Sequence, residues 1–333
     1  MSEQRFLTTH VGSLPRPEAL LDLVFARESG EMVSEAAFEA AVEEATAYVF
    51  RRQIEAGLAI INDGEQSKPS YATYIKHRLS GFGGEAGQYE FADLEAFPGA
   101  KAQVFGNKGR AKRSAPACTA PIEVIDMEAP RKDAERLQRL AGGHATFMSA
   151  ASPGVTALFF PNRFYASDEE YVFALAEGLR HEYETIAAAG ITLQVDCPDL
   201  AMGRHVQFTH LSLEDFRKRI GMNVAALNHA LRNIPAEQLR MHLCWAITRG
   251  RTTAMSPWAR LPISSGKPGR RPCCSRGPIP AMRTNLPSLP ITRCPMTRSS
   301  APAWSSRKAP ISSTPNSSPS ASAAMPICSG PKG

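Results

Sequence analysis

Hydrophobic residues alternate between helical spacing and short apolar runs along the first 245 residues of the chain. Apolar side chains that recur every three or four positions predict an amphipathic helix, and a short apolar run bounded by turn residues predicts a buried strand. We expect helices at 18–28, 34–56, 130–140, 168–189 and 212–233, and strands at 6–11, 58–61, 146–150, 191–195 and 240–245. Helices that alternate with short buried strands predict an α/β domain with a parallel sheet.

Two segments repeat one order of features: the end of a helix, an Ala-Gly pair, an apolar strand and an aspartate. They are Glu55–Asp63 and Ala188–Asp196. Polar residues that directly follow parallel strands lie at the carboxyl edge of the sheet, where α/β barrels keep their active sites. We therefore expect the loop at 62–65 and the residues from Asp196 onward to lie at one functional rim.

The C-terminal part of the chain differs in composition from the rest. Residues 1–245 contain 25 Lys and Arg against 32 Asp and Glu, a net charge of −7. Residues 246–333 contain 13 Lys and Arg and no Asp or Glu, a net charge of +13, with 15 of the 26 prolines. An acid-free segment of this length is unusual for a globular domain and for a disordered segment, which tends to be rich in Glu. We expect a domain at 1–245 and a disordered Pro/Ser/Arg-rich tail at 246–333.

The cysteines and the N-terminus argue against secreted and membrane proteins. None of the 7 cysteines form the C-x-x-C pairs of a zinc ribbon, and there is no signal peptide or membrane-length apolar run. We expect a reduced, cytoplasmic protein without a membrane partner. Residues 79–128 predict a hairpin or an excursion, and its basic stretch at 108–113 is interpreted as a solvated loop, with no nucleic-acid partner expected.

His242 and Cys244 are the first candidates for chemistry. Side chains two positions apart on a strand point to the same face, so the imidazole and the thiol should lie side by side. Both groups are good ligands for Zn²⁺. The alternative is a buried structural histidine beside a buried structural thiol, and an isolated H-x-C pair does not distinguish the two.

Four short motifs resemble, in their order along the chain, the C-terminal catalytic barrel of cobalamin-independent methionine synthase and its single-barrel relatives. They are Thr9-His10-Val11-Gly12-Ser13-Leu14-Pro15-Arg16, Asp63-Gly64-Glu65, Gln194-Val195-Asp196-x-Pro198 and His242-x-Cys244. The resemblance spans residues 6–245. It implies a (β/α)₈ TIM barrel of the methionine synthase and uroporphyrinogen decarboxylase-like type, which we expect to be incomplete at its C-terminal end.

The resemblance implies a zinc-dependent methyltransferase that moves a methyl group onto a thiol such as homocysteine, giving methionine. A methyl donor of the 5-methyltetrahydrofolate type is one option. The family's substrate-binding positions correspond here to Val11, Gly12, Ser13, Glu65 and Asp196, and its H-x-C zinc ligands to His242 and Cys244.

Zinc would make the substrate thiol reactive. A free thiol is mostly protonated near neutral pH, whereas a zinc-bound sulfur is a thiolate. Asp196 and Glu65 would hold the substrate amine and so orient that sulfur toward the methyl donor. Each residue also has a structural alternative: Gly12 as a turn residue, Ser13 as a cap, Asp196 as an N-cap or solvated acid, and Glu65 as a solvated loop acid.

Departures from the family leave the substrates open. The N-terminal barrel of the methionine synthases has no counterpart here, Phe160 falls where they place a tryptophan for the pterin, and Cys197 replaces an acidic residue. The acceptor could be another thiol, as in related transferases acting on coenzyme M. The residues also leave open a non-catalytic protein whose basic tail binds acidic partners such as RNA, and a uroporphyrinogen-type decarboxylase, whose reaction needs no metal.

We interpret residues 246–333 as a segment read in a shifted frame. After H-x-C the family needs two more strands, a Glu ligand and a second Cys ligand, and the tail has no Glu. Residues 273–285 can be encoded by bases that, read from the third base, give Leu-Phe-Glu-Gly-Pro-Asn-Pro-Arg-His-Ala-His-Glu, which resembles the relatives' strand and metal-ligand Glu. Loss of two zinc ligands and of the closing strands predicts weak zinc binding and little or no activity.

Overall fold

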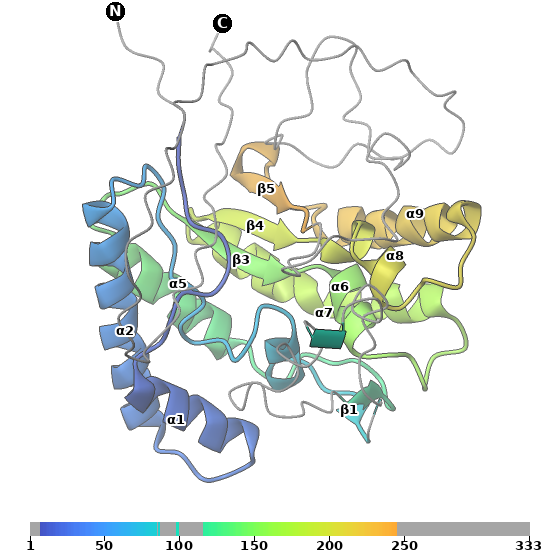
Figure 1. Cartoon of the computed structure of the whole chain (residues 1–333), viewed down its shortest axis with the longest axis horizontal. Coiled ribbons are helices and arrows are strands. Elements are labelled where there is room, and N and C mark those ends of the chain that lie inside the picture. Colours follow the sequence, from blue (N-terminus) through green and yellow to red (C-terminus); the bar gives the residue numbers. More distant parts are fainter. Residues whose placement is uncertain (1–6, 85, 87–97, 100–115, 245–333) are drawn as a thin grey trace, which may run out of the picture. The chain divides into compact units, whose positions relative to one another are not determined.

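A parallel sheet runs through the part of the chain that the computed structural model describes, residues 7–84, 86, 98–99 and 116–244. Its hydrogen-bonded strands are, in spatial order, β3 (Phe147–Ala151), β4 (Thr192–Asp196) and β5 (Leu239–His242). All neighbouring pairs are parallel, and Figure 1 shows the three strands side by side.

Two further segments continue this sheet on the β3 side. Thr9 bridges Ile60, and Ile61 bridges Thr146, both in the parallel sense. The Phe147 amide donates to the carbonyl oxygen of Ile61 at 3.2 Å, which joins the second segment to β3. Five parallel segments therefore follow one another in chain order, and the predicted parallel α/β fold is confirmed.

Helices connect these segments. They are α1 (Glu18–Glu28), α2 (Glu35–Glu55), α5 (Glu128–Ala141), α6 (Pro153–Phe159), α7 (Asp168–Ala188), α8 (Gly203–Val206) and α9 (Leu213–Ala230), with 3₁₀ turns η1 (Thr73–His77), η3 (Pro198–Leu200) and η4 (Ala236–Gln238). α2 packs against α5, α5 against α7 and α7 against α9, in the same order as the strands (Figure 1). This succession is expected when each parallel strand is followed by a crossover helix.

Serine caps and glycine turns place the ends of the longest helices close to their predicted positions. The Ser34 hydroxyl accepts the Ala37 amide at the start of α2, and Ser167 caps α7 in the same way. Gly57 and Gly190, with φ of 75° and 72°, follow the two helices in the left-handed conformation that glycine adopts at low cost. The chain then turns directly into the next parallel segment.

The excursion between η1 and α5 contains a short antiparallel pair, β1 (Phe82–Gly83) with β2 (Ala117–Cys118). A hairpin-like pairing in this region is as predicted. The basic stretch at 108–113 lies outside the described residues, as does the tail at 246–333, on which the predicted incomplete barrel end depends. In the described part of the chain, no helix combines the length and the apolarity needed to cross a bilayer.

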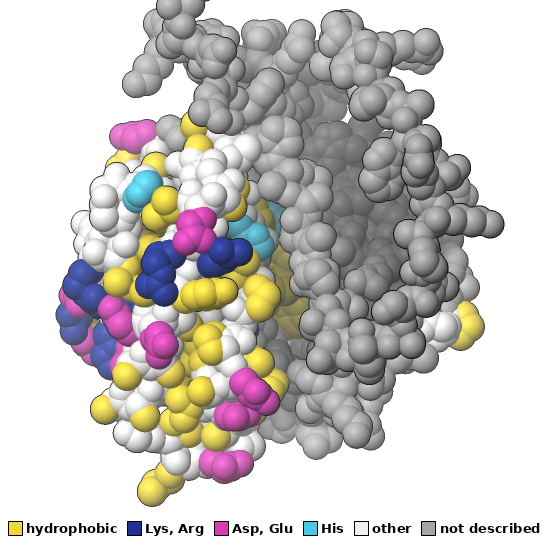
Figure 2. Space-filling model, turned by 60° about the vertical axis from the view of Figure 1, so that its left-hand side comes forward, with side chains coloured by type: hydrophobic (Ala, Val, Ile, Leu, Met, Phe, Trp, Pro, Cys, Tyr) yellow, Lys and Arg dark blue, Asp and Glu magenta, His cyan; other side chains and the backbone are white. Residues whose placement is uncertain are grey.

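The described surface carries charges of both signs. On the face shown in Figure 2, acidic and basic side chains lie among one another and among apolar ones. Pairs such as Arg139 with Glu43, 2.5 Å apart, join α5 to α2.

Candidate substrate and metal site

The predicted site residues lie at the carboxyl ends of neighbouring parallel segments. Glu65 follows the second segment, Asp196 is the last residue of β4, and His242 is the last residue of β5. Ser13 comes from the turn after the first segment and meets the carboxylate of Glu65. In parallel α/β proteins the ligand site lies at this edge of the sheet.

The loop at 62–65 is built by its own side chains. The Asn62 side-chain oxygen accepts the Gly64 amide at 2.8 Å, and the Asp63 carboxylate accepts the Glu65 amide at 3.0 Å. A Cβ on Gly64 would come within 2.8 Å of the Leu14 side chain, so this position needs glycine. Asp63 therefore shapes the turn, and Glu65 is the acid that the turn presents.

Glu65 has an uncommon backbone conformation that Arg16 helps to hold. Its φ is 57°, and among the described residues it is the one non-glycine residue with a positive φ. The Arg16 guanidinium donates to the carbonyl oxygens of Glu65 at 2.5 Å, of Gln66 at 3.1 Å and of Lys68. A planar fork of donors suits several converging carbonyls. Arg16 is the last residue of the motif at 9–16. That motif alone does not indicate that Arg16 holds the backbone around Glu65.

Glu65 is a buried carboxyl and not a solvated loop acid. Its side chain is 2% exposed, and its Oε2 accepts the Ser13 hydroxyl at 2.5 Å. Its Oε1 has no hydrogen-bond partner among the described residues. Burial, followed by the negative charge of Asp196, raises the pKa of Glu65 to about 7. Such a carboxyl would be stabilised in its charged form by a cation placed beside it.

Asp196 and His242 are in direct contact. The Asp196 Oδ1 accepts from the Gln194 side-chain amide at 2.9 Å and from His242 Nδ1 at 3.1 Å. The N-cap position of the following η3 turn is Cys197, so Asp196 is not a cap for that turn. Asp196 is buried, whereas His242 is partly exposed at the end of its strand. The carboxylate thus holds one nitrogen of the imidazole and leaves the other available for chemistry.

Cys244 lies near Tyr71, as do Asp196 and Glu65. Burial raises the pKa of the Tyr71 phenol above its ordinary value, and the nearby Cys244, Asp196 and Glu65 raise it further. Cys244 is partly buried and lies two residues beyond the end of β5. The thiol, the imidazole and the two carboxylates therefore gather at one end of the sheet.

The turn at 11–13 has the conformation expected from its sequence. Gly12 has a φ of 88°, and its carbonyl oxygen accepts from His10 Nε2 at 2.9 Å. Val11 is partly buried beside it. The structural prediction for Gly12, a residue that permits a tight turn, agrees with this geometry; the proposed contact with a substrate stays a prediction.

The described residues provide only part of a zinc-binding set. They contain no group of three or more His, Cys, Asp or Glu side chains placed to share a metal ion. His242 and Cys244 are suitable donors, but zinc sites in proteins use three or four protein ligands. Both residues are chemically suitable zinc ligands, but two ligands are fewer than a zinc site needs.

The stability of the fold should depend on pH through Glu65. Its pKa is about 7 in the folded chain against an ordinary 4.5, so its stabilising contribution is complete below about pH 4.5 and is lost as the pH rises through 7. We expect Glu65→Gln, which resembles the protonated acid, to gain up to about 3 kcal/mol over the unsubstituted chain between pH 4.5 and 8. Urea denaturation at several pH values measures this. The exposed Glu44→Gln is the matched control, and an equal pH-independent offset for both variants would contradict the prediction.

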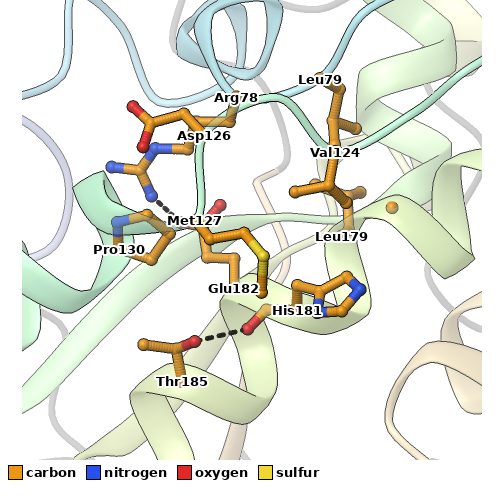
Figure 3. Close-up of a pocket in the computed structure, with 11 residues that line it drawn as sticks. Arg78, Leu79, Val124, Asp126, Met127, Pro130, Leu179, His181, Glu182 and Thr185 are labelled. Atoms are coloured by element: carbon orange, nitrogen blue, oxygen red, sulfur yellow. Dashed lines mark hydrogen bonds and ion pairs between the residues drawn. The ribbon is translucent and has the colours of Figure 1, made fainter.

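A small hollow lies away from this rim, between α5, α7 and the segments at 78–79 and 124–127 (Figure 3). Arg78 and Glu182 line it and form an ion pair of 2.8 Å. His181 and Thr185 lie at its lower side in that view, joined through the His181 carbonyl oxygen. None of the predicted site residues lines this hollow, so it is separate from the candidate site.

The fold and this rim define an α/β protein with a candidate site of buried carboxylates, an imidazole and a thiol at the carboxyl edge of a parallel sheet. The family model described as "Cobalamin-independent synthase, Catalytic domain" matches residues 6–251. The chain belongs to this family, as the four motifs predict.

Curated relatives are similar over the same part of the chain. The methionine synthase of Thermococcus kodakarensis is 26% identical over 240 residues, and that of Saccharolobus solfataricus is 25% identical over 244 residues. Each comparison covers 72% of this chain and 62% of the relative, so the chain spans about three fifths of the relatives' length.

A solved structure shares the fold. A B12-independent methionine synthase from Shewanella sp. W3-18-1, in complex with selenomethionine, matches with a TM-score of 0.51 and 18% identity, over 73% of this chain and 62% of that chain. At this identity the likeness concerns the fold alone.

Proposed function

We propose that this chain carries the first part of the catalytic domain of a methyltransferase that moves a methyl group onto the thiol of an amino acid such as homocysteine, giving methionine, and that loss of the barrel end impairs its own activity. The convergence of Glu65 and Asp196 beside His242 at one sheet edge, within a domain of this family, carries the proposal. We also propose that the five parallel segments are the first part of a (β/α)₈ barrel.

The two carboxylates suit a substrate ammonium group. Glu65 has an unpartnered buried Oε1, and Asp196 forms its hydrogen bonds with described residues through Oδ1, which leaves Oδ2 for the substrate. An ammonium between them would relieve the repulsion that raises the pKa of Glu65, after the larger effect of burial. Holding the amine at two points would fix the position of the substrate sulfur.

His242 and Cys244 would be two of the ligands of a zinc ion, and the described residues supply no group of three such side chains. When bound, zinc keeps a thiol sulfur deprotonated and therefore nucleophilic. The contact from Asp196 holds the His242 ring in one orientation. The methyl donor, of the 5-methyltetrahydrofolate type or another, is left open by these residues.

Binding of two thiols by the chain tests the role of the carboxylates. We expect calorimetric titration to show that Glu65→Gln and Asp196→Asn each weaken L-homocysteine binding by about tenfold or more, because each removes a charged partner of the amine. Exposed Glu44→Gln should bind as the unsubstituted chain does.

The second thiol, 2-mercaptoethanesulfonate, has no amine and tests whether the acceptor is a different thiol. Binding of this thiol alone, unchanged by the two substitutions, would favour a transferase for another thiol. Homocysteine binding that neither substitution weakens would contradict the proposed role of Glu65 and Asp196.

A further inference from the structure

We propose that Gln194 is a positioning residue that orients the Asp196 carboxylate and, through it, sets which nitrogen of His242 carries the proton. The inference depends on the proposed function only in one respect, that His242 would use its imidazole as a zinc ligand. The hydrogen bonds that support it lie among the described residues.

Four side chains form a continuous chain of hydrogen bonds across three adjacent strands, which we call the relay: Ser149, Gln194, Asp196 and His242. The parallel register places Ser149 opposite Gln194 and Asp196 opposite His242. Residues two apart on a strand share a face, so Gln194 and Asp196 point to the same side of β4. The Gln194 side-chain nitrogen lies 3.1 Å from the Ser149 hydroxyl oxygen and 2.9 Å from Asp196 Oδ1. His242 Nδ1 completes the relay at 3.1 Å from the same Oδ1.

The direction of each hydrogen bond follows from the groups themselves. An amide nitrogen has two protons to donate and a carboxylate oxygen only accepts, so Gln194 donates to both of its partners. The reverse orientation of the amide would place its oxygen against Asp196 Oδ1, with acceptor facing acceptor. The same carboxylate oxygen requires His242 Nδ1 to carry a proton. In the neutral ring, Nε2 is then the nitrogen with a free lone pair.

Gln194 is suited to this role by its burial. It is 1% exposed, so water does not replace its amide if the side chain is removed. Methionine has a similar length and no donor, so Gln194→Met would leave Asp196 Oδ1 without its neutral partner. The carboxylate could then rotate, and its hold on the imidazole would loosen.

Nitrogen-15 spectra of the histidine side chains of the full chain, recorded at about pH 8 and assigned with a His242→Gln variant, test the proposal. We expect His242 to be the Nδ1–H tautomer in the unsubstituted chain. In Gln194→Met a population of the Nε2–H tautomer should appear. Gln53→Met is the matched control, because Gln53 is also buried and donates to backbone carbonyls that are not part of the relay.

Two results would overturn the proposal: an Nε2–H tautomer in the unsubstituted chain, or an unchanged Nδ1–H tautomer in a folded Gln194→Met variant. If that variant does not fold, Ser149→Ala removes the other partner of Gln194, and the same shift of tautomer is expected there. Homocysteine binding is not needed for any of these measurements. A failure of the proposed function would therefore be distinguishable from a failure of this inference.

Discussion

Replacing Arg78 with leucine is expected to lower the free energy of unfolding by about 4 kcal/mol, because the substitution leaves buried acids without their principal cation. The Arg78 side chain is 8% exposed. Its guanidinium lies 2.6 Å from Asp133 and 2.8 Å from Glu182. Burial alone would raise the pKa of Asp133, but the charges of Arg78, Arg136 and Lys68 and the hydrogen bond from Ser67 lower it overall. Chemical denaturation at pH 7 measures the loss.

An exposed arginine provides the control for this substitution. Arg139 pairs with Glu43 at 2.5 Å, but its side chain is 61% exposed. Ion pairs in water contribute little, so Arg139→Leu should cost less than about 1 kcal/mol. Arg78, Asp133 and Glu182 form a buried ion cluster. Equal losses of unfolding free energy for Arg78→Leu and Arg139→Leu would mean that this buried cluster does not stabilise the fold.

The buried cluster also connects to the sheet beneath the candidate site. Glu182 accepts the Tyr74 hydroxyl at 2.9 Å and lies 3.6 Å from the Lys68 ammonium. Lys68 in turn donates to the Ser149 carbonyl oxygen at 2.5 Å. A change at Arg78 is therefore expected to reach β3, the strand whose Ser149 hydroxyl begins the relay to His242.

The hydrophobic pattern was sufficient for the longer helices and for the direction of the sheet, but it did not predict the short helices α6 and α8. Periodic apolar positions and serine caps such as Ser34 are local signals, so the helices could be predicted to within a few residues at each end. The predicted strand at 240–245 was too long, because β5 ends at His242. Strand ends depend on the neighbouring strand, which a local pattern does not identify.

The candidate site was predictable in outline because polar residues after parallel strands meet at one edge. Glu65, Asp196 and His242 follow that rule. No local sequence pattern indicates which residues hold these three side chains in place. Gln194 and Ser149 are 45 positions apart, and Arg78 and Glu182 are farther still, so their pairing depends on register and helix packing. The sequence alone does not indicate which buried partner each of them meets.

Restoring the alternate reading frame after the codon for Trp245 is expected to raise the rate of methyl transfer to homocysteine by on the order of a hundredfold or more. The physical reason is the number of ligands. The described residues offer zinc two donors, His242 and Cys244, whereas a tight site needs three or four. The proposed alternate frame would add a Glu ligand, and the family pattern calls for a second Cys ligand and two more strands, which would lie beyond β5, the last described strand. Resequencing the gene at this codon tests the frame itself.

Zinc content and turnover of the two chains measure the effect. The frame-restored chain should retain about one zinc per molecule after dialysis against a mild chelator, and the present chain should lose it. His242→Ala in the frame-restored chain is the matched control, because it removes one ligand without altering the restored strands. Tight stoichiometric zinc and equal turnover in the present chain would contradict the frame hypothesis.

Salt-sensitive RNA binding by the present chain would instead support a basic tail that acts on acidic partners, because only a charge-driven contact weakens steeply with added salt.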